Sequence, residues 1–282
     1  MGIINNTHII YENSKSFYWA SRFLPKKILK KVINIYAFCR LQDDLVDEGI
    51  KIEDSSEVEE LENIIKSYGV SKNIISNLME GINSDKNFKR FKDNSELLRY
   101  CYKVAGVVGL MMIKALDIKQ SEAKYFAIDM GMAMQLTNIS RDIMQDYKKN
   151  RIYIPENTGI NKDNISDMTS ENEIKLKKVV NQIILKSEIY YKSSLNGLRY
   201  IPIRSRLAIL VSLRIYQGIG IKITKTEKKF IHENLYVTNI EKTLIVAKTL
   251  IEFIIFFIFP VYKKKHNVYL HESLEGLHDI HR

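Results

Sequence analysis

Apolar and polar residues alternate along much of the chain with the 3.6-residue period of an amphipathic helix. The clearest stretches are Lys27–Phe38, Ala123–Met144 and Ile174–Leu198. The period of two that is typical of half-buried strands is scarce, and the 282 residues include only four prolines and twelve glycines. No period of about 20–50 residues repeats, which disfavours a solenoid. The pattern predicts an all-α fold in one domain that spans residues 1–282.

Clusters of polar and turn-forming residues predict where these helices end. The breaks are expected near Gly49–Ser56, Ser67–Ser71, Asn83–Asn94, Asp117–Glu122 and Asn157–Ser170. A chain of this length buries roughly three quarters of its unfolded surface, so it can enclose a large core.

Two acidic motifs of the same form lie about a hundred residues apart. The first holds Arg40, Asp43, Asp44 and Asp47, and the second holds Gln135, Asn138, Arg141, Asp142 and Asp146. On a continuous helix, the four polar residues of the first motif fall on one stripe about 100° wide, amid apolar neighbours. In the second motif, Gln135, Asn138, Asp142 and Asp146 fall on a stripe about 80° wide. One such motif alone is usually a solvated charged face, but two of them favour a functional site.

These motifs point to a metal-clamped diphosphate leaving group. Two carboxylates ~4 Å apart repel by ~4 kcal/mol at an effective dielectric of ~20, so facing acidic stripes need cations between them. Oxygen ligands with few histidines suit Mg²⁺ or Mn²⁺ better than zinc. The nearby Arg40, Arg141 and Arg151 are suited to bidentate binding of phosphate oxygens.

Cysteine usage and net charge limit the compartment in which the protein works and the partners that it binds. Cys39 and Cys101 have apolar neighbours and no metal-ligand spacing, so we expect buried free thiols in a reducing compartment. The N-terminal residues lack the features of a signal peptide, and we expect a cytoplasmic protein. The net charge of +10 suits binding to nucleic acid, to an anionic membrane or to acidic substrates. No nucleic-acid-binding motif is present, so we do not expect nucleic acid as a partner.

An apolar run, Phe253–Phe259, precedes the basic run Lys263–Lys265. It is far shorter than the ~20 residues that span a bilayer. Two interpretations stay open for residues 244–265: a buried core helix, or an interfacial contact that holds the protein peripherally on the inner face of the membrane.

Several motifs in order resemble those of the squalene and phytoene synthases, which join two prenyl diphosphates head to head. The matching segments are Ser14–Phe17, Tyr36–Arg40, Asp43–Asp47, Glu80–Asp85, Arg99–Leu110, Gln135–Asp146 and Asn150–Pro155. The resemblance covers about Asn13 to Tyr236 and is strongest to the bacterial phytoene synthases, whose ending is also similar to His271–Leu277.

The resemblance implies an isoprenoid-synthase-type helical bundle around a central active-site cavity. It implies that the metals are held by Asp43, Asp47, Asp142 and Asp146, with Asn138 as an additional ligand. Together with those aspartates, Tyr100 and Arg141 are implied to be catalytic. The implied substrate-binding residues are Ser14, Lys15, Ser16, Arg40, Tyr100, Gln135, Asn138, Arg141, Arg151, Tyr153 and Tyr216.

Two further expectations concern the central motif and one departure from the family. Tyr100 and Tyr102 are expected to line a cavity near a carbocation, which tyrosine rings attract by ~0.5–2 kcal/mol. The small residues nearby either leave room for a prenyl tail or allow close helix packing; these are Ala105, Gly106, Gly109, Gly131 and Ala133. Asn234 stands where the family often has arginine, so Lys242 substitutes for it or one diphosphate is held more loosely.

The expected reaction joins two geranylgeranyl diphosphates to phytoene through a cyclopropyl diphosphate, the first committed step of carotenoid biosynthesis. It requires Mg²⁺ or Mn²⁺ and no NADPH, and no dinucleotide-binding fingerprint is present. Neighbouring enzymes of the carotenoid pathway stay open as partners. The alternatives are a squalene or dehydrosqualene synthase acting on farnesyl diphosphate, and a non-catalytic assembly factor, which the intact aspartates disfavour. One sequence does not give the prenyl chain length, the metal preference or the oligomeric state.

Overall fold

The computed structural model describes residues 19–48, 56–226, 235–258 and 262–280, with the side chains of Asp47, Glu48 and Phe257 excepted. Within these ranges every regular element is a helix and no strand occurs, which confirms the all-α prediction. The α-helices are α3 (Lys26–Glu48), α4 (Ser56–Ser67), α5 (Lys72–Ser84), α6 (Asn94–Cys101), α7 (Val107–Ala115), α8 (Ala123–Arg141), α9 (Ile143–Lys148), α10 (Lys162–Ser166), α11 (Ser170–Leu195), α12 (Ile203–Lys225) and α13 (Asn239–Ile258). A π-helical turn, η2 (Tyr102–Gly106), joins α6 to α7, and the 3₁₀ turns are η3 (Glu156–Thr158), η4 (Asn196–Tyr200) and η5 (Val268–Leu274).

Helices end at the predicted breaks that the structure describes, and a further break separates α11 from α12. The gaps between α4 and α5, α5 and α6, and α7 and α8 lie where the polar clusters are, whereas most of the first predicted break lies outside the described residues. The break predicted at Asn157–Ser170 contains η3 and the short helix α10. A capping box begins α10, in which Asn161 and Asn164 each accept a hydrogen bond from the other's backbone N–H at 3.0 and 2.9 Å. Five residues show too little periodicity to predict such a helix.

The second acidic motif is not one continuous helix, contrary to the prediction. The backbone of Asp142 leaves helical geometry, with φ −101° and ψ 17°, so α8 ends at Arg141 and α9 begins at Ile143. The Asp142 N–H still donates to the Asn138 carbonyl at 2.9 Å. Asp142 therefore stands at a bend, and the side chains on either side of it do not share one straight stripe.

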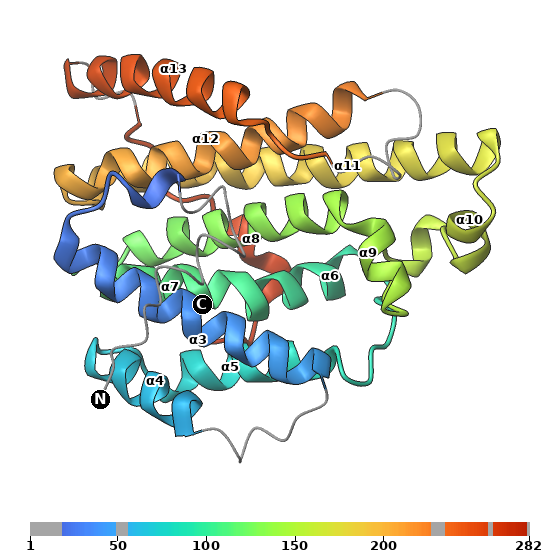
Figure 1. Cartoon of the computed structure of the whole chain (residues 1–282), viewed down its shortest axis with the longest axis horizontal. Coiled ribbons are helices and arrows are strands. Elements are labelled where there is room, and N and C mark those ends of the chain that lie inside the picture. Colours follow the sequence, from blue (N-terminus) through green and yellow to red (C-terminus); the bar gives the residue numbers. More distant parts are fainter. Residues whose placement is uncertain (1–18, 49–55, 227–234, 259–261, 281–282) are drawn as a thin grey trace.

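Helix α8 is the centre of the molecule (Figure 1). It packs against α11 and α12 on one side and against η2 and α7 on the other. Two glycines permit the second contact. A Cβ on Gly109 would lie 2.1 Å from the Ala127 carbonyl oxygen, and a Cβ on Gly131 would lie 2.1 Å from that of Ala105. At these two positions the small residues allow close packing of backbones.

The segment after α13 returns to the core and packs beneath α8 and α6. It is held by polar contacts between buried side chains and its own backbone: Tyr190 Oη donates to the Leu270 carbonyl at 3.0 Å, and Tyr102 Oη donates to the carbonyl of His278. Arg99 donates to two further carbonyls of this segment. Residues 262–280 therefore complete the bundle rather than trail from it.

Candidate active site

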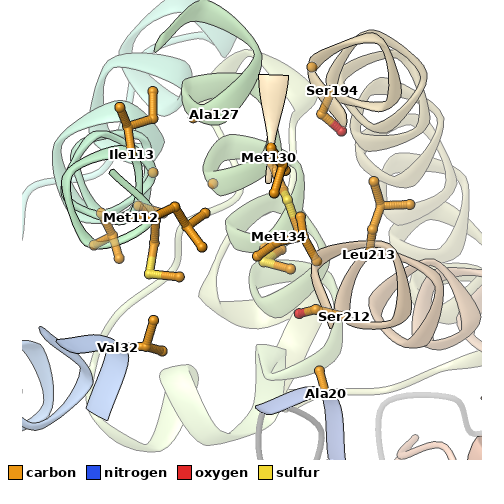
Figure 2. A pocket seen from close by; sticks show the side chains of 18 of the residues that line it. Ala20, Val32, Met112, Ile113, Ala127, Met130, Met134, Ser194, Ser212 and Leu213 are labelled. Atoms are coloured by element: carbon orange, nitrogen blue, oxygen red, sulfur yellow. The ribbon is translucent and has the colours of Figure 1, made fainter. Parts of the chain in front are cut away.

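An elongated cavity of about 310 Å³ lies beside α8 and is enclosed by α3, α7, α11 and α12. Its walls are overwhelmingly apolar. Figure 2 shows Met112 of α7 facing Met130 and Met134 of α8 across it, with Val32 of α3 and Leu213 of α12 at its sides. Such a cavity suits a long hydrocarbon chain and excludes water.

The cavity follows one face of α8 for most of its length. The α8 residues that line it are Ala123, Phe126, Ala127, Met130, Gly131, Met134, Gln135 and Asn138. From Ala123 to Asn138 this face is ~22 Å long at ~1.5 Å per residue. Among the lining residues, Gln135 and Asn138 bring polar side chains to the end nearest the second acidic motif, and Tyr36 and Tyr216 add phenol rings to the wall.

Three carboxylates, those of Asp85, Asp142 and Asp146, meet beyond that polar end. The pKa of Asp146 is raised to about 7, first by burial and then by the negative charges of Asp142 and Asp85, while Lys149 and Arg151 oppose the shift. The ionised form of Asp146 is therefore disfavoured by burial and by repulsion from the two neighbouring carboxylates. A bound cation would offset this repulsion.

Asn138 is positioned as an oxygen ligand for such a cation. Its Oδ1 is buried and accepts no hydrogen bond from any residue that the structure describes, while its Nδ2 donates to Gln135 Oε1 at 3.4 Å. One amide oxygen and three carboxylates form the hard-oxygen donor set that Mg²⁺ and Mn²⁺ prefer. The residues present therefore fit the divalent metal that the sequence predicts.

The first acidic motif lies on the C-terminal half of α3. Asp43 is exposed, and its charge contributes to raising the pKa of Tyr36 to about 12, after burial and Tyr216. This places Asp43 near the wall formed by the two tyrosines. Arg40 donates from Nε to Asp44 Oδ2 at 3.0 Å, so in this structure its guanidinium is paired with a carboxylate of the same motif. The backbone of Asp47 continues α3, and its side chain lies outside the described part of the chain.

Arg141 is paired with the residue that follows it. Its Nε and Nη2 donate to the two oxygens of Asp142 at 2.7 and 2.5 Å, and this pairing raises the pKa of Arg141 against the opposing effect of burial. The guanidinium also lies 5.3 Å from the centre of the Tyr236 ring. Arg141 thus neutralises one carboxylate of the site and leaves Asp146 to repel Asp85.

Tyr100 and Tyr153 stack on one another beside the carboxylates, with ring centroids 5.1 Å apart. Tyr100 Oη donates to Asp85 Oδ2 at 2.9 Å, and Arg151 Nε donates to the Asp85 carbonyl at 3.3 Å. Neither ring is among the residues that line the apolar cavity. Tyr100 therefore holds Asp85 in place, contrary to the expectation that it lines the cavity.

Tyr102 likewise does not line the cavity. Its side chain is fully buried and donates to the carbonyl of His278. Asp85 is a site residue that the sequence did not predict, although the two tyrosines beside it were predicted. The signal available was the position of Asp85 directly after α5, inside a motif that was matched but given no role.

Some predicted site residues lie outside the described ranges. These are Ser14, Lys15, Ser16 and Asn234. Of the remainder, the structure gathers Gln135, Asn138, Asp142, Asp146, Arg141, Arg151, Tyr100 and Tyr153 around the polar end of the cavity, with Tyr216 in its wall. Lys242 is buried on α13.

A second cluster of possible metal ligands lies elsewhere on α8. Asp129 accepts hydrogen bonds from His266 Nε2 at 2.9 Å and from His271 Nε2 at 2.8 Å. Each histidine takes a separate carboxylate oxygen, at hydrogen-bond distance. The cluster is ~20 Å from Asp142 along α8. Its geometry is that of a structural hydrogen-bond network.

Comparisons with known proteins give the family and the fold of the chain. A family model described as squalene/phytoene synthase matches residues 10–241. The chain is 30% identical to a 15-cis-phytoene synthase of Pantoea ananas, over 83% of this chain and 86% of the relative, and 28% identical to a 4,4'-diapophytoene synthase of Staphylococcus haemolyticus, over 83% and 91%. Its fold is similar to a crystal structure of a dehydrosqualene synthase with a ligand, with a TM-score of 0.73, 26% identity, and 88% and 94% of the two chains covered.

Proposed function

The chain belongs to the squalene/phytoene synthase family and is a prenyltransferase of that type. We propose that it joins two molecules of geranylgeranyl diphosphate head to head to form phytoene. This would be the first committed step of carotenoid biosynthesis. Relatives named for phytoene synthesis support the choice of product.

The length of the apolar cavity carries the proposal. At the ~1.2 Å advance per bond of an extended chain, a four-unit geranylgeranyl chain reaches ~18 Å and a three-unit farnesyl chain ~13 Å. The lined face of α8 is ~22 Å long, and Ala123 and Phe126, at the end far from Asn138, still line the cavity. The longer substrate fills this cavity, whereas the shorter one leaves its far end empty.

The polar end supplies the groups that a departing diphosphate needs. We assign metal binding to Asp142, Asp146 and Asn138, and to Asp43 and Asp47 of the first motif. When bound, Mg²⁺ or Mn²⁺ would neutralise the negative charge that develops on the leaving group. We assign diphosphate binding to Arg151 and Arg40, because guanidinium binds phosphate oxygens in bidentate fashion. A diphosphate would then replace the Asp85 carbonyl and the Asp44 carboxylate as their partners.

The walls of the cavity support the carbocation chemistry that follows. As the first diphosphate leaves with its bonding electrons, the double bond of the second chain attacks the allylic cation, and loss of a proton closes the cyclopropane. A second ionisation, rearrangement and proton loss end the reaction without a reductant. The rings of Tyr36 and Tyr216 attract the cation by ~0.5–2 kcal/mol each, and the aliphatic walls keep water from capturing it.

Product analysis tests the proposal. The purified protein is given Mg²⁺ with geranylgeranyl or farnesyl diphosphate, with and without NADPH. A C40 hydrocarbon from the longer substrate, independent of NADPH, is the expected result. A C30 product from farnesyl diphosphate would overturn the substrate assignment in favour of a dehydrosqualene-type synthase, which the diapophytoene synthase relative favours as the second candidate. Absence of metal-dependent diphosphate release from both substrates would indicate a non-catalytic role.

A further inference from the structure

Helix α13 presents an aliphatic face to the outside of the molecule. The exposed residues on this face are Ile240, Leu244, Ala247, Ile251, Ile254, Ile255 and Ile258. At 100° per residue they form a stripe about 100° wide and ~27 Å long, here named the α13 stripe. Its isoleucines and leucine are between 49% and 75% exposed. Contiguous exposed apolar surface of this extent marks an interaction site.

The opposite face of α13 packs against the rest of the molecule. It packs against α12, and Figure 1 shows α13 as an outermost helix of the bundle. Both acidic residues of α13 are paired with cations of α12: Glu252 Oε2 accepts from Arg214 Nε at 2.9 Å, and the partly exposed Glu241 accepts through Oε2 from Lys222 Nζ at 3.1 Å. The α13 stripe therefore carries no carboxylate.

One exposed lysine flanks the α13 stripe, and three more follow the helix in the sequence, where the Lys264 N–H donates to Asn196 Oδ1 of η4 at 3.1 Å. Lys248 is exposed beside it, and Lys263, Lys264 and Lys265 are all exposed shortly after the helix ends. An aliphatic stripe with a basic flank and no acid matches a surface of acyl chains beneath anionic headgroups. A second copy of the chain would cover the aliphatic side chains but would leave the lysines without acidic partners, because both glutamates of α13 are already paired with cations of α12.

The geometry favours a helix that lies in the interface over one that crosses the bilayer. Helix α13 holds four charged residues. Among the described helices, α12 alone is long and apolar enough to span a membrane, but 56% of its apolar window is buried in the protein, where it lines the cavity. Neither helix is arranged to leave the bundle.

We propose that the α13 stripe and Lys263–Lys265 dock the protein on an anionic lipid surface, with α13 in the plane of the interface. The cavity wall formed by α12 then lies directly behind the docked helix. The proposal stands on the exposed surface alone and does not depend on the product that the enzyme makes.

Vesicle sedimentation tests the docking surface with the full chain. The vesicles are phosphatidylcholine alone, or phosphatidylcholine with about 30 mol % phosphatidylglycerol. The stripe variant is Ile251→Gln, Ile254→Gln and Ile255→Gln, and the basic variant is Lys263→Gln, Lys264→Gln and Lys265→Gln. The matched control carries three glutamines at exposed apolar positions of α11, namely Ile174→Gln, Leu185→Gln and Ile189→Gln. Unchanged circular dichroism melting verifies the fold of each variant.

We expect the unsubstituted protein to prefer the anionic vesicles. The stripe variant should bind both vesicle types at least about tenfold more weakly, and the basic variant should lose the preference for phosphatidylglycerol along with its salt dependence. The α11 control should bind as the unsubstituted protein does. Equal binding by the stripe variant and the control would overturn the proposal. So would a lipid-free dimer, measured by analytical ultracentrifugation, that dissociates only in the stripe variant.

Discussion

Asp129 Oδ1 and His271 Nε2 lie 2.8 Å apart in the protein interior, although 142 residues of sequence separate them. His266 bonds the other oxygen of the same carboxylate at 2.9 Å. Burial alone would raise the pKa of Asp129, but the two histidine hydrogen bonds outweigh it and hold this pKa below its ordinary value. The ionised carboxylate therefore fastens residues 262–280 to the central helix.

Asp129→Asn should lower the free energy of unfolding by about 2–4 kcal/mol at neutral pH, because an amide NH₂ faces one of the two histidine N–H donors. Urea denaturation measures it, with the exposed Asp163→Asn as the control. A depressed carboxyl pKa stabilises the fold fully above the unfolded-state value of about 3.8 and progressively less as pH falls below it. The difference between variant and unsubstituted protein should thus shrink in acid. An equal difference at pH 3 and pH 7 would contradict this account.

Asp146 should give the opposite pH dependence in metal-free protein. Its folded-state pKa of about 7 lies above the ordinary 3.8, so the folded state binds the extra proton between these values. The free energy of unfolding should fall as pH rises across this window, by at most about 4 kcal/mol. Asp146→Asn should remove that slope and, with it, the catalytic activity. Chemical denaturation at a series of pH values in EDTA measures the slope, and a slope retained in the variant would refute the assignment.

Asp142→Ala should lower turnover by at least about a thousandfold, because it removes a metal ligand aimed at the leaving group. The variant should also lose most of the rise in melting temperature that Mg²⁺ gives the unsubstituted protein. Diphosphate release and thermal unfolding with and without Mg²⁺ are the two measurements. Asp163→Ala, on the exposed surface of α10, serves as the control and should change neither. Near-native turnover in Asp142→Ala would exclude it as a ligand.

Ala127→Leu should shift substrate preference toward the shorter prenyl chain. Ala127 lines the deep part of the cavity, and only ~16 Å of the α8 face separates it from Asn138 (Figure 2). A leucine there obstructs a chain of ~18 Å but not one of ~13 Å, by the extended-chain lengths used above. The ratio of kcat/KM for geranylgeranyl over farnesyl diphosphate should fall at least about tenfold. Met130→Leu keeps the side-chain volume and should leave the ratio near its original value.

Gly109→Ala should reduce the free energy of unfolding by about 2–3 kcal/mol or more, since its Cβ would lie 2.1 Å from the Ala127 carbonyl oxygen and must push α7 from α8. Gly220→Ala is the matched control. Its Cβ meets Ile184 at an ordinary 3.4 Å, and alanine favours the helix, so this change should be neutral or stabilising. Equal melting temperatures for the two variants would refute the close-packing role of Gly109.

Periodicity was sufficient to predict the long helices, because burial of one face fixes the spacing of apolar residues. The bend at Asp142 was not predictable, since Ile139 and Ile143 keep the helical period across it. The pairing of carboxylates within each motif follows from local spacing. The contribution of Asp85 does not, because it depends on how α5 meets the loop that holds Arg151 and Tyr153. Tyr102 was expected to line the cavity, and only the path of the chain near His278 shows that its side chain is held elsewhere.

The contact between Asp129 and the two histidines also imposes an order on biosynthesis. His266 and His271 are translated 137 and 142 residues after Asp129. Until the ribosome releases them, the central helix holds a carboxylate that cannot be desolvated without large cost. Closing the core around α8 before residue 271 is available therefore carries this desolvation cost, and we expect the last helix turn and the central helix to close together, after synthesis of residue 271.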